Sequence, residues 1–184
     1  MKKFVRVMDG TKSNAGGFEY KLDEINISNN WNLNEVEPEK TGGFNFSSED
    51  KILRWLHRGD TIYDVIIPEG TEIVLCNKEK GVWRANKMIV TNPRMITDEM
   101  VIELYKKTTL SNKIIAQCLE TLLWKNRLKV SEYIIKDRVN KGNIDEFIKE
   151  FENYVKKSEK FKYDELGKDS KIIYDMLKRI KLGE

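Results

Sequence analysis

The spacing of apolar residues changes near residue 96, and this change constrains the fold more than any other feature of the 184-residue chain. Before that point, short apolar runs alternate with turn signals such as Asp9-Gly10, a pattern typical of strands. After it, apolar residues recur every three or four positions, as along one face of a helix. The sequence therefore predicts an α+β protein, with a small mixed or antiparallel sheet domain at residues 1–95 and a helical bundle domain at residues 96–184.

The first half is predicted to contain four main strands and one short helix. The run from Ile62 to Ile67 is almost continuously apolar, so we expect it to be buried on both faces. A further strand ending at Phe46 leads into the helix, which Ser47 or Ser48 can cap. The pair Asn92-Pro93 is expected to break the last strand. The four main strands are placed near residues 3–8, 61–67, 71–76 and 82–91.

Residues 11–40 form a long segment rich in Asn, Gly and Ser. A segment of this length without regular structure is often a functional loop in a compact domain. We interpret it as an irregular surface segment that a few apolar side chains hold in place. These anchors are Phe18, Tyr20, Ile25, Ile27 and Trp31.

The second half is predicted to be almost wholly helical. Thr97 and Ser111 are suited to cap the first two helices. The second of these helices, residues 111–125, carries an apolar stripe at helical spacing and is expected to form the centre of a small bundle. Further helices are expected from about Ser131 to Gly142, from Asn143 onward, and near the C-terminus.

Composition and cysteine usage narrow the class of protein. No apolar run approaches the roughly 18 residues that span a bilayer, and the start of the chain lacks a signal-peptide pattern. We therefore expect a cytoplasmic protein without a membrane partner. Cys76 and Cys118 are interpreted as buried reduced thiols, although a bridge between them stays open. With one histidine and no CxxC pair, no metal site is expected.

The net charge of +3 is mild, and its excess lies on the helical half as mixtures of Lys and Glu. Such mixtures usually form solvated helix faces, whereas a specific nucleic-acid site normally has denser Lys and Arg clusters. Nucleic acid is therefore not the expected partner. The abundance of Lys, Ile and Asn is typical of an AT-rich genome, such as that of a low-GC bacterium or one of its phages.

No complete catalytic motif is present. Phosphate-binding glycine loops of the Walker or GxGxxG type are missing, and the glycine pair Gly42-Gly43 is not followed by the helix and lysine that a phosphate cradle needs. The lone histidine, His57, stands at the C-terminal end of a predicted helix. There it is expected to complement the helix dipole.

One order of motifs stands out. The strand that contains Arg6 is followed, about forty residues later, by Phe46-Ser47-Ser48 at a helix start, and then by a strand that leads into a Pro-x-Gly-Thr step at Pro68. This order resembles the mono-ADP-ribosyltransferase fold, in which an arginine strand, an aromatic-serine strand and a glutamate strand surround NAD. The resemblance covers residues 4–91, about half the chain.

The resemblance implies specific roles for the cofactor NAD. Arg6 would contact its phosphates through the planar fork of guanidinium donors. Ser47 would brace the nicotinamide ribose, and Phe46 or Trp55 would stack on the nicotinamide ring.

The sequence departs from this family at the catalytic glutamate. In the family, a glutamate before the last of these strands stabilises an oxocarbenium-like transition state. Arg84 and Lys87 occupy this stretch here, and their charge has the wrong sign for that task. Glu72, and after it Glu69, are the candidates for a displaced catalytic carboxylate, although both lie one strand earlier.

Three functional hypotheses follow. The first is a non-enzymatic accessory or inhibitory factor, encoded by a phage or mobile element, that binds another protein and needs no cofactor. The second is an NAD-dependent ADP-ribosyltransferase that uses Glu72. The third is a nucleic-acid-binding regulator in which the predicted helices at residues 111–125 and 131–140 form a helix-turn-helix variant. We expect the first, because the chain lacks a complete catalytic set.

Overall fold

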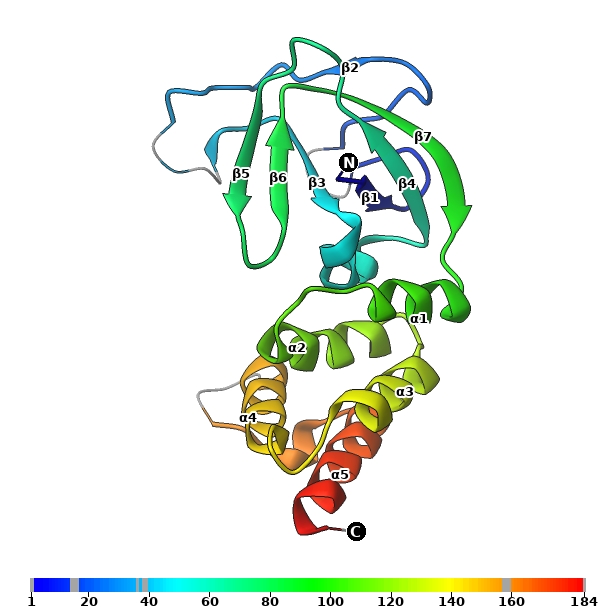
Figure 1. Ribbon diagram of the computed structural model, residues 1–184, viewed down its shortest axis with the longest axis vertical. Coiled ribbons are helices and arrows are strands. Elements are labelled where there is room, and N and C mark those ends of the chain that lie inside the picture. The colour runs from blue at the N-terminus through cyan, green and yellow to red at the C-terminus, as the bar shows by residue number, and fades with distance from the viewer. Residues whose placement is uncertain (1, 14–16, 36, 38–39, 157–159, 184) are drawn as a thin grey trace.

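The computed structural model describes the chain except for residues 1, 14–16, 36, 38–39, 157–159 and 184. A β-sheet and a group of helices lie end to end along the longest axis (Figure 1), and the 3₁₀ helix η2 (Glu49–Arg58) lies between them. The predicted α+β class is confirmed, as is the order of sheet first and helices second.

Seven strands pair in antiparallel fashion in the order β2-β7-β4-β1-β3-β6-β5. The strand that carries Arg6 is therefore internal, with neighbours on both sides. The bounds are Phe4–Met8 for β1, Asn26–Ile27 for β2, Phe44–Ser48 for β3, Thr61–Ile66 for β4, Ile73–Asn77 for β5, Val82–Ala85 for β6 and Lys87–Met95 for β7.

The single strand predicted at residues 82–91 is wrong, because the chain bends at Asn86 and forms two strands there. Strand β6 pairs with β3 and β5, whereas β7 pairs with β4 and β2 at the other end of the sheet. The break expected at Asn92-Pro93 is also wrong. The register of β7 against β4 shifts there, so a β-bulge accommodates the proline and the strand continues to Met95.

Helices α1–α5 make up the second half, as predicted. Two of the predicted caps are confirmed, since Thr97 accepts a hydrogen bond from the Met100 amide and Ser111 accepts one from the Ile114 amide. Ser48 precedes η2, but its side chain makes no capping hydrogen bond. The bounds are Asp98–Lys106 for α1, Asn112–Leu123 for α2, Leu128–Arg138 for α3, Ile144–Val155 for α4 and Lys168–Leu182 for α5, with a 3₁₀ turn, η3, at Tyr163–Glu165.

The larger hydrophobic core crosses the boundary between sheet and helices. Val5 and Val7 of β1 and Leu53 of η2 belong to the same buried cluster as the apolar faces of α1–α5. A second, smaller cluster lies on the opposite face of the sheet, where Tyr20 from the 11–40 segment packs on the strands. The boundary near residue 95 therefore separates two kinds of secondary structure that share one core.

The 11–40 segment is held in place by fewer apolar anchors than predicted. Tyr20 is buried, but Ile25 and Ile27 are exposed, contrary to their predicted anchoring role. The buried residue between them is Asn26, whose side chain makes four hydrogen bonds that close the local turn and join it to β7. Similarly, Ile66 at the end of β4 is exposed, so burial of that strand on both faces does not extend to its last residue.

The two cysteines are free thiols. Cys118 is fully buried, which raises the pKa of its thiol to about 12, whereas Cys76 is only partly buried. Within the described residues, no helix is long and apolar enough to span a bilayer. The same part of the chain contains no cluster of three or more His, Cys, Asp or Glu side chains that could hold a metal ion.

Candidate functional site

The sheet opens between its two central strands, β1 and β3. These strands pair only at Phe4 with Ser48 and at Val5 with Ser47. Beyond Val5 they diverge: β1 stays with β4, and β3 stays with β6. A gap in the middle of a sheet leaves backbone polar groups without ladder partners, so another group must satisfy them.

The side chain of Arg6 bridges this gap. Its Nη1 donates to the main-chain oxygen of Asn45 on β3, and its Nη2 donates to Ser13 Oγ at 3.1 Å. The guanidinium also lies 4.9 Å from the centre of the Tyr20 ring. Burial in this position lowers the pKa of Arg6 from its usual value, because desolvation disfavours the charged form.

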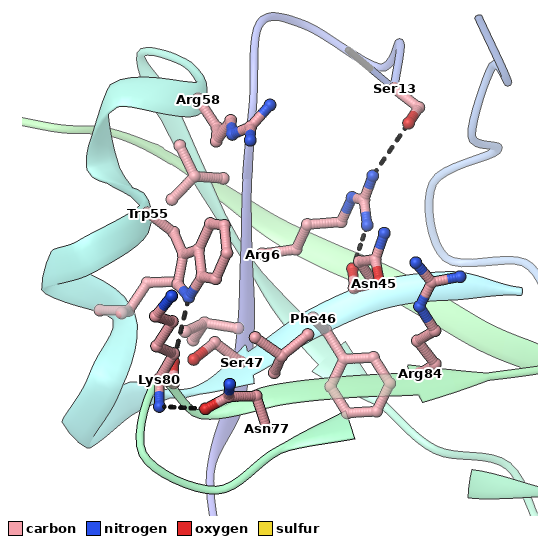
Figure 2. A pocket seen from close by; sticks show the side chains of 14 residues that line it. Arg6, Ser13, Asn45, Phe46, Ser47, Trp55, Arg58, Asn77, Lys80 and Arg84 are labelled. Carbon is pink, nitrogen blue, oxygen red and sulfur yellow. Dashed lines mark hydrogen bonds between the residues drawn. The ribbon is translucent and has the colours of Figure 1, made fainter. Parts of the chain in front are cut away.

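A cavity of about 380 Å³ lies where the strands diverge, a size typical of small-molecule sites. Its wall combines β1 and β3 with one face of η2 and the hairpin between β5 and β6 (Figure 2). The lining residues are Val5, Arg6, Val7, Ser13, Asn45, Phe46, Ser47, Ile52, Trp55, Arg58, Asn77, Lys80, Val82 and Arg84.

The charged residues of the cavity all have the same sign. Arg6, Arg58, Lys80 and Arg84 are cationic, and none of the described lining residues is acidic. In the described part of the chain, no carboxylate forms an ion pair with Arg6, Lys80 or Arg84. The Nε atoms of Arg6 and Arg84 are buried there without a hydrogen-bond partner. A wall of this kind attracts anions, and the planar fork of arginine matches the geometry of phosphates and carboxylates.

Two aromatic side chains line the same cavity. Trp55 is only partly buried, and its Nε1 donates to the main-chain oxygen of Lys80 at 3.2 Å, which fixes the indole against the hairpin. Phe46 is buried, and its ring packs edge-on against Phe4 at 5.0 Å between centroids. Trp55 is therefore the better placed of the two to stack on a planar ligand group.

Ser47 is buried and lines the cavity. Its hydroxyl donates to the main-chain oxygen of Ser48 at 3.2 Å, and a hydroxyl oxygen can accept hydrogen bonds as well. The structure thus brings Arg6, Ser47 and Phe46, the three cofactor-binding residues predicted from the resemblance, to one cavity.

A second cavity of about 200 Å³ adjoins the first, and the two share Arg6, Ser13 and Asn45. Its wall includes the 28–30 loop and the start of β3. This loop and the adjoining Trp31 pack closely on two glycines with positive φ. A Cβ at Gly42 would lie 1.8 Å from the main-chain oxygen of Asn30, and one at Gly43 would lie 2.5 Å from the Trp31 ring.

The predicted catalytic residue, Glu72, lines neither cavity. It is exposed just before β5, where its carboxylate accepts hydrogen bonds from Trp31 Nε1 and from Asn86 Nδ2, the latter at 3.1 Å. The main chains of Glu72 and Asn86 are also joined. Glu72 thus ties the 11–40 segment to the bend between β6 and β7. Glu69 is exposed in the preceding turn.

Sequence reasoning named Arg84 only as an obstacle to catalysis, yet Arg84 lines the cavity whereas Lys87 does not. It missed Arg58, Lys80 and Asn77 altogether. The only available signal for Arg58 was its position one helical turn after Trp55. The two hairpin residues carried no signal, because they reach the cavity only through the fold of the β5–β6 hairpin.

His57, predicted to complement the dipole of η2, lies beside the site in a different environment. Burial, together with the neighbouring cations Arg58 and Arg54, lowers its pKa to about 4. The imidazole is therefore neutral at neutral pH, so it adds no charge at the end of the helix. Its Nδ1 is buried without a hydrogen-bond partner in the described part of the structure.

No protein-family model, curated protein or solved structure matches this chain. The resemblance to the ADP-ribosyltransferase fold therefore stays a prediction. The function of the cavity has to be inferred from its own residues, which are cationic and aromatic and include no carboxylate among those described.

Proposed function

We propose that this protein is a non-enzymatic binding protein whose sheet cavity holds an anionic dinucleotide of the NAD class. The observation that carries the proposal is the composition of the cavity wall: four cations, an accessible indole and no acidic side chain among the described lining residues. Phosphate groups match the cations, and a planar base or nicotinamide ring matches Trp55.

The arrangement of two adjoining cavities favours a dinucleotide over a mononucleotide. Arg6 stands at their junction, where a central diphosphate can accept from its guanidinium while the two planar ends of the ligand occupy the two cavities. The larger cavity offers Trp55, and the smaller one offers the rings of Phe18 and Phe44. The motif order that resembles ADP-ribosyltransferases supports the same ligand class independently.

We expect NAD to bind without being cleaved, because the charged side chains that line the cavity are all positive. Cleavage of the bond between nicotinamide and ribose develops positive charge on the sugar, and a carboxylate near that charge is the group that stabilises it. The described lining residues present only positive charge, and Glu72 is engaged by Trp31 and Asn86 outside the cavity. An ADP-ribosyltransferase that uses Glu72 is therefore less well supported than a binding protein.

The accessory role suggested by the sequence fits a binding protein of this kind, and its protein partner stays a prediction. The dinucleotide would then be the small ligand that such an accessory factor carries or detects.

Calorimetric titration with NAD, ADP-ribose and nicotinamide tests the proposal. NAD and ADP-ribose should bind, and nicotinamide alone should bind far more weakly, because it lacks the phosphates that the arginines recognise. Lys80→Ala should weaken NAD binding about tenfold, the usual effect of losing one charge-assisted contact. Lys78→Ala is the matched control, since Lys78 is exposed in the same hairpin and does not line the cavity.

Arg6→Ala should also weaken NAD binding, and it should lower the melting temperature because the contacts of Arg6 to Asn45 and Ser13 are lost. The proposal is wrong if the wild-type protein shows no NAD binding up to about 1 mM, a concentration at which even weak specific sites fill. It is also wrong if Lys78→Ala and Lys80→Ala weaken binding equally, because the attraction would then be a general effect of charge.

A further inference from the structure

A chain of aromatic rings extends from the rim of the cavity onto the helices. Trp55 lies 6.4 Å from His57, His57 lies 5.7 Å from Trp124, and Trp124 lies 6.0 Å from Tyr154, between ring centroids. The Trp124–Tyr154 pair is stacked, with an angle of 27° between the ring planes. These residues come from η2, the end of α2 and α4, so the chain of rings spans the junction between sheet and helices.

Cationic side chains are interleaved with these rings. The Arg54 guanidinium lies 5.5 Å from the ring centres of both Trp55 and Tyr154. Lys51 and Arg54 lie one turn apart on one face of the 3₁₀ helix η2, whereas Arg58 lies one turn after Trp55 on the face that lines the cavity. Lys51 Nζ donates to the main-chain oxygens of Glu79 and Thr109 at 3.2 and 3.4 Å, which leaves its charge uncompensated. In the described part of the chain, no carboxylate forms an ion pair with Lys51 or Arg54, and Nε and Nη1 of Arg54 are buried without a hydrogen-bond partner.

Part of this chain of rings is exposed to solvent and is not covered by packing between the sheet and the helices. Trp124 is 57% exposed, more than any other aromatic residue among the large exposed apolar side chains. An indole that stacks on Tyr154 with one part of its surface and stays this exposed keeps area free for another planar group. Its neighbour Lys125 is paired with Asp60, so the available positive charge lies on η2.

We infer that this surface binds single-stranded nucleic acid. Bases stack on Trp124 and Tyr154, and the backbone phosphates follow the Lys51 and Arg54 face of η2. Aromatic platforms beside a cationic groove are the usual means by which proteins hold single strands without reading their sequence. An acidic peptide would use the same cations, but it has no need for an exposed indole. The inference does not rest on the proposed dinucleotide site, although the two surfaces meet at Trp55.

Fluorescence anisotropy of a labelled oligothymidine of about 12 nucleotides, within the usual range of site sizes, tests the inference with the full chain. Binding should weaken steadily between about 50 and about 200 mM salt, because bound phosphates release counterions. Trp124→Ala should weaken it about tenfold or more, the usual effect of losing one stacked base. Tyr163→Ala is the matched control, since it removes another partly exposed aromatic ring outside the chain of rings.

A Lys51→Gln variant provides a second test if Trp124→Ala proves unstable, and it should reduce both the affinity and its salt dependence. NAD binding should be unchanged in Trp124→Ala, which separates this surface from the cavity. Four results would overturn the inference: no binding at low salt, equal affinity of wild type and Trp124→Ala, equal affinity for the matching duplex, or equally tight binding of an oligoglutamate peptide that also depends on Trp124.

Discussion

At the scale of the residue, charged and polar side chains near the cavity act mainly by holding segments of the chain in position. Arg6 replaces the missing ladder contacts between β1 and β3, and Glu72 fixes Trp31 of the 11–40 segment. On the other side of β1, Asp64 of β4 holds Arg94 of β7. Its hydrogen bonds with Arg94 lower its pKa to about 2.

The Glu72 contacts predict a difference between two substitutions. Glu72→Gln keeps an oxygen that accepts from Trp31 Nε1, so the 11–40 segment should keep its position. Glu72→Ala removes the acceptor for both Trp31 and Asn86, which should cost about 0.5–1.5 kcal/mol, the net value of a typical hydrogen bond. Urea unfolding of both variants measures the difference. Equal stabilities would mean that the hydrogen bonds of Glu72 contribute nothing.

His57 predicts a pH dependence. Its folded pKa of about 4 lies below its usual value of 6.5, so the unfolded chain binds a proton more readily. Stability from the neutral imidazole is complete above 6.5 and is lost as the pH falls towards 4. Wild type should therefore lose melting temperature across this range, and His57→Phe, which keeps the ring and cannot bind a proton, should lose less.

Asp64 provides the internal reference for that experiment. Because its pKa is lowered from 3.8 to about 2, its contribution is lost only below the range in which His57 acts. Parallel curves for wild type and His57→Phe between pH 6.5 and 4 would exclude His57 as the source of the effect.

At the scale of the element, the spacing of apolar residues was enough to predict whether a segment is a helix or a strand. It was not enough to predict which strands pair with one another. The helical stripe of residues 111–125 and the caps Thr97 and Ser111 were sufficient to predict α1 and α2. The stretch from Val82 to Thr91 reads as one continuous strand, and only the sheet shows that it pairs in two directions on either side of Asn86. Local pattern carries no information on pairing partners.

Helix α2 is predicted to stabilise the helical half more than its neighbours do. Leu119 is fully buried on it, in contact with the core that joins α2 to the other helices. Leu119→Ala should therefore lower the free energy of unfolding by about 2–5 kcal/mol, the usual cost of such a cavity. Gln117→Ala on the same helix, at a half-buried polar position, is the comparison and should cost far less. A loss below about 0.5 kcal/mol for Leu119→Ala would contradict its place in the core.

At the scale of the whole molecule, the cavity is a product of long-range assembly. Arg6, Ser47 and Phe46 could be named in advance because the order of their motifs resembles a known family. The sequence did not predict the other polar lining residues, Arg58, Lys80 and Asn77. They lie together only because η2 and the β5–β6 hairpin pack beside the opening between β1 and β3. The core shared by sheet and helices holds η2 in that position.

On the proposed function, the cavity binds an intact dinucleotide. Saturation-transfer NMR on NAD mixed with the full-length protein tests binding and cleavage in one sample. Both the adenine and the nicotinamide protons should receive saturation from the protein, and free nicotinamide should not accumulate faster than it does in buffer. Absence of transfer to NAD, or steady release of nicotinamide by the wild-type protein, would contradict the proposed function.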